Sequence, residues 1–564
     1  MWAWACVNVY DEKSFTYGNT FETFLNYCKQ FDNSIFYFHN LKYDGEFIIS
    51  YLFSHGFSWT NKRKPINKQF TTLISDKGMF YSIKVNYKGT IIEFRDSLKI
   101  INMSVADIAK AFGLPESKGE IDYHKYRPPG YVMTPDEVSY IRNDVIIVAK
   151  ALLYFFNQGL VKMTQGSDAL YDFKTHFGNN KNFRKRFPLL PEDIDTFLRR
   201  AYKGGFVYVN PSIKGEIQEH GYILDVNSLF PSKLRNYPMP YGEPVHYYGK
   251  YEKDDLYPLY VQHISCMFKI KPGKIPTIQI KHTLAFQENE YLESSNFEIV
   301  DLYLTSVDLK LFLEHYETSN LIYHEGYKFK AMIHTELVEY IDKWTAVKIQ
   351  AGKDKNKGLR TIAKLMLNAL YGKFGLSITV ASKIPYFEDG IVKYKLSEKE
   401  TRDGVYLPVA LFTTAYGRET TITMSQKVRE ISLHTTNQDL YFYSDTDSIH
   451  TGLSKDLILK TFDVDPYEIG KWDIEGEFIN GLYIRQKCYL ETVLQDDNTY
   501  KITPTVAGLP KGMHDLVTYD NFKIGSSFYR EEHECTRPGQ KTKKRFKHVP
   551  GGVVLVDTSF KIKG

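Results

Sequence analysis

The stretch YFYSDTDSIH, residues 441–450, constrains the fold more than any other part of the sequence. Aromatic and β-branched residues flank Asp445, Thr446 and Asp447, which predicts two short strands joined by a tight acidic turn. The two carboxylates are two residues apart, so they can point to the same side of an extended tip. Such a pair suits Mg²⁺, which takes oxygen ligands and serves phosphoryl or nucleotidyl transfer. A solvated aspartate turn explains the same pattern, so a partner carboxylate is required.

Asp225 is the candidate partner. It ends the apolar run of residues 222–224, which predicts a strand, and Pro231 lies near the start of the helix that follows. Asp225 should therefore project from a strand end into a cleft. The fold can bring this position to the acidic turn, although about two hundred residues separate them in the sequence.

Length and composition limit the class of protein. A chain of 564 residues is too long for one hydrophobic core, so several domains are expected. Hydrophobic residues make up 43% and charged residues 25%, which is ordinary for a globular protein. The net charge of +5 permits an anionic polymer as partner. Aromatic residues, at 15%, supply core volume and also platforms on which unstacked bases can lie.

The cysteines are scattered, odd in number and without Cys-x-x-Cys spacing: Cys6, Cys28, Cys266, Cys488 and Cys535. This argues against a zinc site or a disulfide framework, and for a reducing compartment. The sequence also lacks a run of about eighteen apolar residues and a secretory signal pattern. We therefore expect an intracellular protein that does not span a membrane.

A long helical pattern over residues 341–375 carries a candidate phosphate-binding face. Lys364, Asn368 and Gly372 are four residues apart and share one side, and Lys348 and Arg360 add positive charge. Cations on such a face can meet a triphosphate, and a glycine lets a base pair approach the backbone. A solvated basic helix explains any single lysine. Asn and Gly are poor helix residues, however, and their place on this face favours a function.

The first 165 residues hold a second group of polar candidates. Asn40 and Asp44 lie in a turn after a predicted strand, and Tyr140 and Asp144 share a face of a predicted helix. Two further candidates, Lys118 and Glu120, lie in a loop between them. Each of these residues alone is better explained as a surface polar side chain.

Several basic segments are candidates for contact with a nucleic acid backbone. Tyr202 precedes a lysine and the pair Gly204-Gly205, which allows close backbone approach, although a plain turn explains the glycines as well. Further along, alternating residues on one predicted strand could touch a duplex end: Arg485, Lys487 and Tyr489. The densest basic run covers residues 541–547, where a solvated loop is the alternative to duplex binding.

Three segments, in order, resemble motifs A, B and C of the family B DNA polymerases: DVNSLFP, KLMLNALYGKFG and YSDTDSIH. KCY at residues 487–489 resembles the KxY motif of the same family. Further segments resemble the protein-primed replicative polymerases of the φ29 group of Bacillus phages: YKGGF, HNLKYDG, KGEIDYH, TIQIK and VPGGVVLVD. The similarity extends over almost the whole chain.

The resemblance implies a multidomain α/β fold, with an RNase H-like 3′-5′ exonuclease domain followed by a right-hand polymerase. It implies these boundaries: exonuclease-like domain 1–164, palm 165–236 and 408–515, insertions 237–335 and 376–407, fingers 336–375, and thumb 516–564. In that group the two insertions serve the terminal-protein primer, processivity and strand displacement. The expected partners are primer-template DNA, deoxynucleotides and a terminal protein, and the expected setting is a monomer in the cytoplasm of a bacterial host.

The resemblance also implies roles for individual residues. Asp225 and Asp447 hold two Mg²⁺ ions, which Mn²⁺ can replace, with Asp445 and the Val226 carbonyl assisting. Lys348, Arg360 and Lys364 bind the triphosphate. The nascent base pair lies against Asn368 and Gly372, and the primer terminus lies against Lys487 and Tyr489.

Two departures from the family pattern lead to expectations of their own. Phe230 stands where the group has Tyr, and its ring should still fill the space of a ribose 2′-hydroxyl, so selectivity for deoxynucleotides should survive. The DxE motif that precedes the first Trp-Ala segment of the exonuclease domain is missing, because the chain opens at Met1-Trp2-Ala3. Without those two carboxylates, proofreading is expected to be weak or absent and the sheet to lack its first strand.

Other classes of protein remain as alternatives. A non-catalytic nucleic-acid-binding scaffold would keep the basic and aromatic surface without needing all three aspartates. An RNA polymerase of another class would not be expected to carry an aromatic residue after DVNSL, and a standalone nuclease is opposed by the missing DxE motif.

Overall fold

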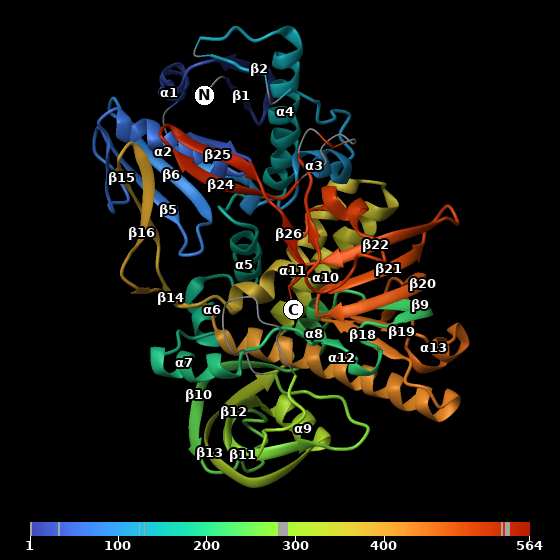
Figure 1. Cartoon of the computed structure of the whole chain (residues 1–564). Helices are drawn as coiled ribbons and strands as arrows, with labels where there is room; N and C mark the ends of the chain where they lie inside the picture. The colour runs from blue at the N-terminus through green and yellow to red at the C-terminus, as the bar shows by residue number, and fades with distance from the viewer. Residues whose placement is uncertain are drawn as a thin grey trace.

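The computed structural model describes residues 3–31, 34–122, 125–128, 130–279, 291–531, 534–535 and 542–563. These residues form a region rich in N-terminal elements, a central region and an insertion at the opposite end (Figure 1). The chain returns near its C-terminus to the N-terminal region, so segments from both ends lie side by side. No helix among the described residues is both long and apolar enough to cross a membrane.

A five-stranded sheet of order β3-β7-β6-β5-β4 forms the N-terminal region, with β3 at one edge. Its strands are β3 (Ile35–Phe38), β4 (Ser58–Trp59), β5 (Gln69–Ile74), β6 (Phe80–Tyr87) and β7 (Thr90–Asp96). A separate hairpin and four helices accompany this sheet: β1 (Trp4–Asn8), β2 (Asp11–Gly18), α1 (Phe21–Cys28), α2 (Leu41–Ser54), α3 (Val105–Phe112) and α4 (Pro135–Asn157). The strand predicted before Asn40 is confirmed as β3, and the helix predicted to carry Tyr140 and Asp144 is confirmed as α4. Asp44 lies in α2 and not in the predicted turn.

Local sequence explains where α4 begins. The Thr134 side chain accepts the Glu137 backbone N–H, and the Glu137 carboxylate accepts the Thr134 N–H at 2.9 Å. This reciprocal capping satisfies backbone donors that a helix start leaves without partners. The helix that carries Tyr140 and Asp144 therefore has a fixed start.

The central sheet has seven strands in the order β22-β21-β20-β9-β19-β18-β8. Its strands are β8 (Val207–Val209), β9 (Ile217–Val226), β18 (Tyr441–Asp445), β19 (Ser448–Thr451), β20 (Trp472–Arg485), β21 (Cys488–Leu494) and β22 (Tyr500–Val506). The long helix α12 (Leu407–Thr436) packs against β18 and β19, and α13 (Lys455–Thr461) follows β19. The strand pair predicted around the acidic turn is confirmed as β18 and β19.

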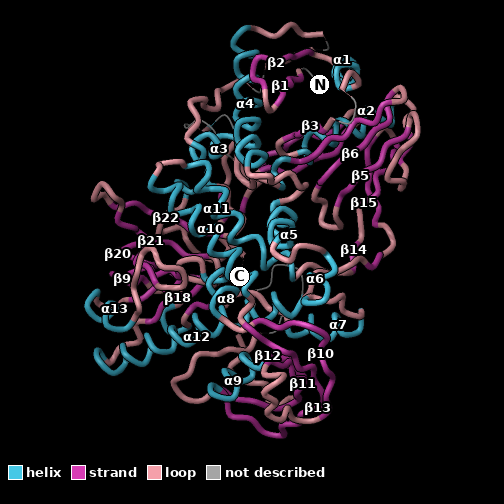
Figure 2. The backbone as a smooth tube through the Cα atoms, turned by 180° about the vertical axis from the view of Figure 1, so that it is seen from behind, coloured by secondary structure: helices cyan, strands magenta, loops and turns pink. Residues whose placement is uncertain are grey.

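The long helix predicted over residues 341–375 is two helices, α10 (Thr335–Lys353) and α11 (Lys357–Phe374). Lys355 adopts a left-handed conformation with φ 54°, and the Asn356 side chain accepts the Leu359 N–H at 3.0 Å to begin α11. A left-handed residue ends a helix, which the periodicity of the apolar residues does not reveal. The two helices pack against each other beside the central sheet (Figure 2). Smaller helices lie around them: α5 (Gln165–Thr175), α6 (Asn180–Arg186), α7 (Glu192–Ala201) and α8 (Leu229–Asn236).

Two β-rich segments interrupt the central region. The described residues between 237 and 335 include an antiparallel sheet, here called the insertion sheet, of order β10-β13-β11-β12. Its elements are β10 (Met239–Tyr248), β11 (Leu259–Ile270), β12 (Val300–Thr305), α9 (Ser306–His315) and β13 (Tyr316–Met332). The second segment forms two small hairpins: β14 (Thr379–Val380) with β17 (Glu400–Thr401), and β15 (Lys383–Glu388) with β16 (Ile391–Leu396).

The C-terminal segment joins distant parts of the molecule. Strands β23 (Ser527–Phe528) and β26 (Phe560–Lys561) pair near the central region, while the hairpin of β24 (Lys544–Val549) and β25 (Gly552–Asp557) lies on α2 (Figure 1). Glu46 of α2 accepts the Tyr394 hydroxyl of β16 at 2.7 Å and lies 3.4 Å from His548 of β24. One buried carboxylate thus connects the N-terminal region, the second insertion and the C-terminal hairpin. Part of the predicted basic run lies on β24, and Lys541 is outside the described residues.

Candidate active site

Three neighbouring strands bring the predicted aspartates together. In the central sheet β19 lies between β9 and β18, and Ser448 pairs with Asp225 on one side and with Asp445 on the other. The Val226 N–H donates to the Asp447 carbonyl at 2.9 Å. Asp225 and Asp447 therefore sit side by side at the ends of adjacent strands, as the sequence predicted. Together with Asp445 they are called the acidic site below.

Close packing fixes the tip of the acidic turn. Thr446 has φ 64°, and its N–H donates to the Phe206 carbonyl at 2.7 Å. The Thr421 hydroxyl of α12 donates to the Thr446 carbonyl at 2.6 Å. Gly205 lies so close that a β-carbon there would be 2.6 Å from the Thr446 side chain. The second glycine of the Gly204-Gly205 pair is thus needed for its approach to the acidic turn.

At Asp225 and Asp447, burial and the charges of neighbouring acids outweigh the nearby positive charges. Burial, followed by the charges of Asp447, Glu475 and Asp473, raises the pKa of Asp225 to about 8. Burial likewise raises the pKa of Asp447 to about 6, with Asp445 and Glu475 contributing. Carboxylates that crowd together in this way favour protons or a bound cation.

Sequence reasoning missed two acidic neighbours of this site. Asp473 of β20 pairs directly with Asp225, and Glu475 lies two residues further along the chain. The segment WDIEGEF carries acids at alternate positions before an aromatic residue, which resembles the pattern of the acidic turn. That alternation was the available signal.

The residues expected to alternate on one strand instead surround a hairpin turn, so that prediction is wrong. β20 ends at Arg485, β21 begins at Cys488, and these two residues pair across the turn. Lys487 has φ 53°, a left-handed conformation that a continuous strand does not contain. Its Nζ lies 2.6 and 2.7 Å from the two carboxylate oxygens of Asp445. Arg485 donates to the Lys563 carbonyl at 2.7 Å, so part of its guanidinium is occupied by the C-terminal segment.

Tyr489 lies in the same neighbourhood. Its ring centroid is 4.9 Å from that of Tyr443, whose hydroxyl donates to Asp445 at 3.2 Å. Burial raises the pKa of Tyr489 above its usual range. The hydroxyl therefore stays protonated and can donate a hydrogen bond.

Basic residues of α10 and α11 face the acidic site. Burial lowers the pKa of Lys348, and the nearby charges of Lys364 and Arg360 lower it further. The charge of Lys364 in turn lowers the pKa of Asp225, although burial and the acidic neighbours outweigh it. Three cations therefore gather next to the crowded carboxylates, which is the charge pattern that a metal-bound triphosphate requires.

The exposed face of α11 continues from this basic group. Lys364, Asn368 and Gly372 are all exposed, whereas Leu367, Leu370 and Phe374 are buried. A β-carbon at Gly372 would meet nothing within 4 Å. The face is therefore open beside Gly372, as a surface for a base pair would need to be.

Phe230 lies against this face. Its ring centroid is 4.5 Å from that of Tyr371, and a β-carbon at Gly417 of α12 would be 2.8 Å from the Phe230 ring. Burial raises the pKa of Tyr371, and the nearby charge of Asp447 also contributes to raising the pKa of Tyr371. Phe230 is thus held between two helices, close to the acidic site.

Arg418 of α12 anchors the segment that contains Tyr202, Gly204 and Gly205. Its guanidinium donates to the carbonyls of Lys203 and Gly204 at 2.8 Å, and also to Asp308 of α9 at 2.7 and 2.9 Å. Burial opposes the charge of Asp308, but Arg418 keeps the pKa of Asp308 below its usual value. The Tyr202 ring packs against Gly375 at the end of α11.

The polar candidates of the N-terminal region form two smaller groups. Asn40, with φ 76°, precedes α2 and donates its N–H to Asp96 at 3.0 Å. Burial, together with the charge of Asp96, raises the pKa of Asp44 to about 7. Sequence reasoning missed Asp96, although it ends a strand as Asp225 does.

The second group surrounds Asp144. Burial raises the pKa of Asp144, while Lys118 and a hydrogen bond with Tyr140 lower it. One Asp144 carboxylate oxygen is buried without a hydrogen-bond partner among the described residues. Glu120 is exposed.

Comparison with known proteins places this geometry in a family. The family model for DNA polymerase type B, organellar and viral, matches residues 27–127 and 117–457. The DNA polymerases of Bacillus phage PZA and Bacillus phage phi29 are each 42% identical to the chain, over all of it and 96% of each relative. The DNA polymerase of Streptococcus phage Cp-1 is 34% identical over 94% of the chain and 88% of the relative.

Solved structures agree with these relatives. The structure of phi29 DNA polymerase with primer-template DNA and incoming nucleotide substrates superimposes with a TM-score of 0.89 and 40% identity. The superposition covers 100% of this chain and 96% of the phi29 DNA polymerase chain. The expected multidomain α/β fold with exonuclease and polymerase domains is thereby confirmed. The chain belongs to the organellar and viral type B DNA polymerases, which are nucleotidyltransferases.

Proposed function

We propose that this DNA polymerase joins deoxynucleotides to a primer by two-metal nucleotidyl transfer at the acidic site. The observation that carries the proposal is the adjacency of Asp225 and Asp447, whose pKa values are both raised by burial and by neighbouring acids. The donor set is made of oxygen atoms only, and it lies beside three cations that suit a triphosphate. Asp225, Asp447 and the Val226 carbonyl would hold two Mg²⁺ ions, which Mn²⁺ can replace. The ions supply Lewis acidity for the primer hydroxyl and the leaving pyrophosphate.

The ion pair with Lys487 gives Asp445 a supporting role. A carboxylate with a lysine 2.6 Å away is already neutralised, so Asp445 contributes less negative charge to a metal than Asp225 or Asp447 does. Lys487 is exposed and lies between the acidic site and solvent. When a primer phosphate binds, Lys487 can leave Asp445 and pair with the phosphate instead. Tyr489 can donate a hydrogen bond to the primer nearby.

The nucleotide would lie between α11 and the acidic site. Lys348, Arg360 and Lys364 bind its triphosphate, and Asn368 and Gly372 line the nascent pair. Phe230 fills the space that a ribose 2′-hydroxyl would need, because Tyr371 and Gly417 hold its ring in place. Selectivity for deoxynucleotides follows from this packing.

The DNA would follow the segment of Tyr202, Gly204 and Gly205, which Arg418 holds beside the acidic turn. Arg485 would contribute to this path through Nη2, because its Nε donates to the Lys563 carbonyl and its Nη1 to the Gln486 carbonyl. The contact of Glu46 with Tyr394 and His548 connects the N-terminal region, the second insertion and the C-terminal hairpin. Such a connection would support processive synthesis with strand displacement.

The relationship to phi29 DNA polymerase supports further assignments. We infer priming by a terminal protein and action as a monomer in the cytoplasm of a bacterial host. The insertions 237–335 and 376–407 would serve the terminal protein and processivity. The remaining assignments are exonuclease-like 1–164, palm 165–236 and 408–515, fingers 336–375, and thumb 516–564.

Extension of a labelled primer on a single-stranded template, with Mg²⁺ and deoxynucleotides, tests the proposal. The unchanged chain should extend the primer, and Asp447→Ala should not. A matched control is Asp255→Asn, which alters a fully exposed acid of the insertion. Extension by Asp447→Ala at the rate of the control would refute the assigned metal site, and no extension by the unchanged chain would refute the activity.

A further inference from the structure

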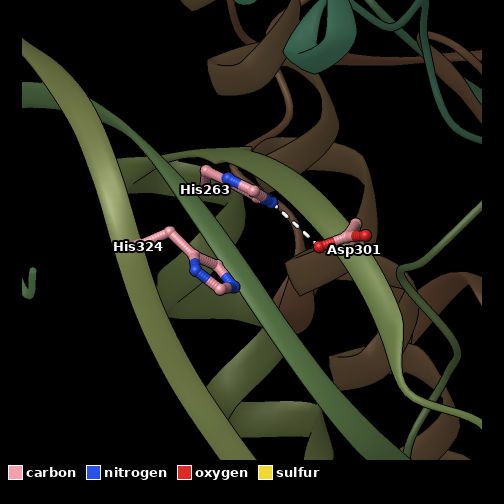
Figure 3. A group of neighbouring side chains, drawn as sticks. All are labelled: His263, Asp301 and His324. Atoms are coloured by element: carbon pink, nitrogen blue, oxygen red, sulfur yellow. Dashed lines mark hydrogen bonds and ion pairs between the residues drawn. The ribbon is translucent and has the colours of Figure 1, made fainter.

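Three metal-ligating side chains gather on the insertion sheet, which is separate from the central sheet. They are His263 of β11, Asp301 of β12 and His324 of β13 (Figure 3). One ligand atom from each lies within 4.8 Å of the others. We propose that these residues bind a late first-row divalent metal ion, and that Zn²⁺ is the ion their chemistry fits.

The strand register explains how three distant residues reach one face. In the pair of β11 and β12, His263 opposes Tyr303 and Ser265 opposes Asp301, while the alternate residues are buried in the sheet's core. His263 and Asp301 therefore share the outer face. Their Nε2 and Oδ1 atoms are 2.9 Å apart.

A β-bulge brings the third ligand to this face. His263 opposes Glu325, whereas the next residue of β11, Ile264, opposes Tyr323, so His324 is an extra residue on β13. A bulge re-aims the side chain that it carries. In this case it directs His324 beside His263, with ring centroids 4.4 Å apart.

His263 is held in place before any ion binds. Its ring is nearly parallel to that of Tyr303, at 6° and 4.3 Å between centroids, and its side chain is only 16% exposed. Arg200 of α7 donates to the Tyr303 hydroxyl at 2.6 Å. A metal site benefits from a ligand whose rotamer is already fixed by packing.

The distances allow coordination after a small movement of one residue. Zn²⁺ binds imidazole nitrogen at about 2.0–2.1 Å, which places tetrahedral ligand atoms about 3.4 Å apart. His263 and Asp301 are already within that separation, and His324 is exposed and can rotate. Ser265 Oγ lies 2.8 Å from His324 Nε2. With Nδ1 bound to the ion, Nε2 keeps its proton and donates it to Ser265, which fixes the ring.

The ligand types select the class of ion. Two imidazoles with one carboxylate suit Zn²⁺ and its neighbours, whereas Mg²⁺ prefers oxygen ligands alone. The lack of Cys-x-x-Cys spacing speaks against a zinc site made of cysteines. It does not speak against a site whose histidine and aspartate ligands come from three separate strands. Three protein ligands leave a fourth position for water or for a group of a partner. An ion here would connect β11, β12 and β13.

Co²⁺ is a suitable probe, because its visible absorption reports tetrahedral coordination by nitrogen and oxygen and separates this from thiolate binding. The full chain is titrated with Co²⁺ in excess Mg²⁺, so that Mg²⁺ fills the oxygen-only acidic site. We expect one equivalent of tetrahedral Co²⁺ without a thiolate charge-transfer band. Competing Zn²⁺ should displace it and should raise the melting temperature of the unchanged chain.

Variants of the ligands test the assignment. Asp301→Asn keeps the shape of the side chain and should weaken Co²⁺ binding by about tenfold or more, as should His324→Ala. The control is His220→Ala, which removes an exposed histidine from its pair with Glu477 on the central sheet, at 2.9 Å, and should leave binding unchanged. Circular dichroism checks that each variant is folded.

Two outcomes would overturn the proposal. One is the absence of tetrahedral Co²⁺ in the unchanged chain, which would leave His263 and Asp301 as a plain ion pair. The other is equal affinity in Asp301→Asn and in His220→Ala, which would place the bound ion elsewhere. If His324→Ala fails to fold, Asp301→Asn alone decides between these results.

Discussion

The acidic site of the central sheet and the N-terminal region both contain buried aspartates, but the two regions position these aspartates differently. Asp225 and Asp447 end adjacent strands, and a backbone hydrogen bond from Val226 links those strands. Asp44 and Asp144 lie on the separate helices α2 and α4, and each has its own neighbours. Asp44 faces Asp96, whereas Asp144 faces Lys118 and Tyr140.

This difference shows what makes a carboxylate pair a candidate metal site. Adjacent strands fix the distance between Asp225 and Asp447, so their repulsion cannot relax by movement and is balanced by a proton or by a bound cation. Asp44 and Asp144 lie on separate helices, so no strand pairing fixes the distance between their carboxylates. The charge of Asp144 is already opposed by Lys118, so it depends less on a bound ion.

Neutralising Asp225 should produce the largest difference between the two regions. Asp225→Asn should lower the rate of primer extension by about a thousandfold or more, because metal-assisted charge stabilisation contributes several kcal/mol. Asp144→Asn should leave extension unchanged. Rapid-quench measurement of single-nucleotide incorporation gives both rates. Equal losses in the two variants would mean that the regions are not functionally distinct.

The basic group beside the acidic site gives the next largest effect. Lys364→Ala should lower kcat/KM for deoxynucleotides by about 10–100-fold, since a hydrogen bond between charged groups contributes about 1.5–3 kcal/mol. Lys353→Ala, at the exposed end of α10, is the matched control and should change little. Steady-state incorporation at varied nucleotide concentration measures both. An unchanged kcat/KM in Lys364→Ala would remove this lysine from the triphosphate site.

Phe230 should affect selectivity rather than rate. Phe230→Ala opens space beside Tyr371 and should reduce discrimination against ribonucleotides by about tenfold or more, whereas Phe230→Tyr should retain it. The measurement is the ratio of kcat/KM for the two sugar types. The interpretation would be wrong if the unchanged chain already incorporated ribonucleotides at nearly the deoxynucleotide rate.

The pH dependence of stability should be the smallest of these effects. The pKa of Asp225 in the folded protein, about 8, is above its ordinary value of 3.8. Between pH 3.8 and about 8, the folded protein therefore keeps a proton on Asp225 that the unfolded chain releases. Its contribution to stability is therefore full below pH 3.8 and is lost as pH rises through about 8. Denaturant unfolding without metal should show a flatter profile for Asp225→Asn between these limits, and added Mg²⁺ should oppose the loss. A profile that Asp225→Asn does not change would contradict the pKa shift.

The sequence predicted this site well where a motif coincided with local structure. The acidic turn, the strand before Asp225 and the exposed face of α11 all follow from residue patterns within one or two elements. The aspartates could be connected because three motifs occur in one order, which limits the possible topologies.

The errors arose where backbone conformation or strand pairing decides the structure. Left-handed residues at Lys355 and Lys487 break a helix and a strand that periodicity treats as continuous. The acids Asp473 and Asp96 become neighbours of the predicted carboxylates only through folding. The bulge at His324 is likewise invisible in the sequence, because register depends on the partner strand.

If Asp225 and Asp447 form one metal centre that the N-terminal acids do not share, both metal ions of a complete complex should lie at the acidic site. Anomalous diffraction from crystals of the chain with Mn²⁺, primer-template DNA and a deoxynucleotide tests this arrangement. We expect two Mn²⁺ peaks, both within bonding distance of Asp225 or Asp447. Peaks confined to the region of Asp44 and Asp144, with none at the acidic site, would contradict it.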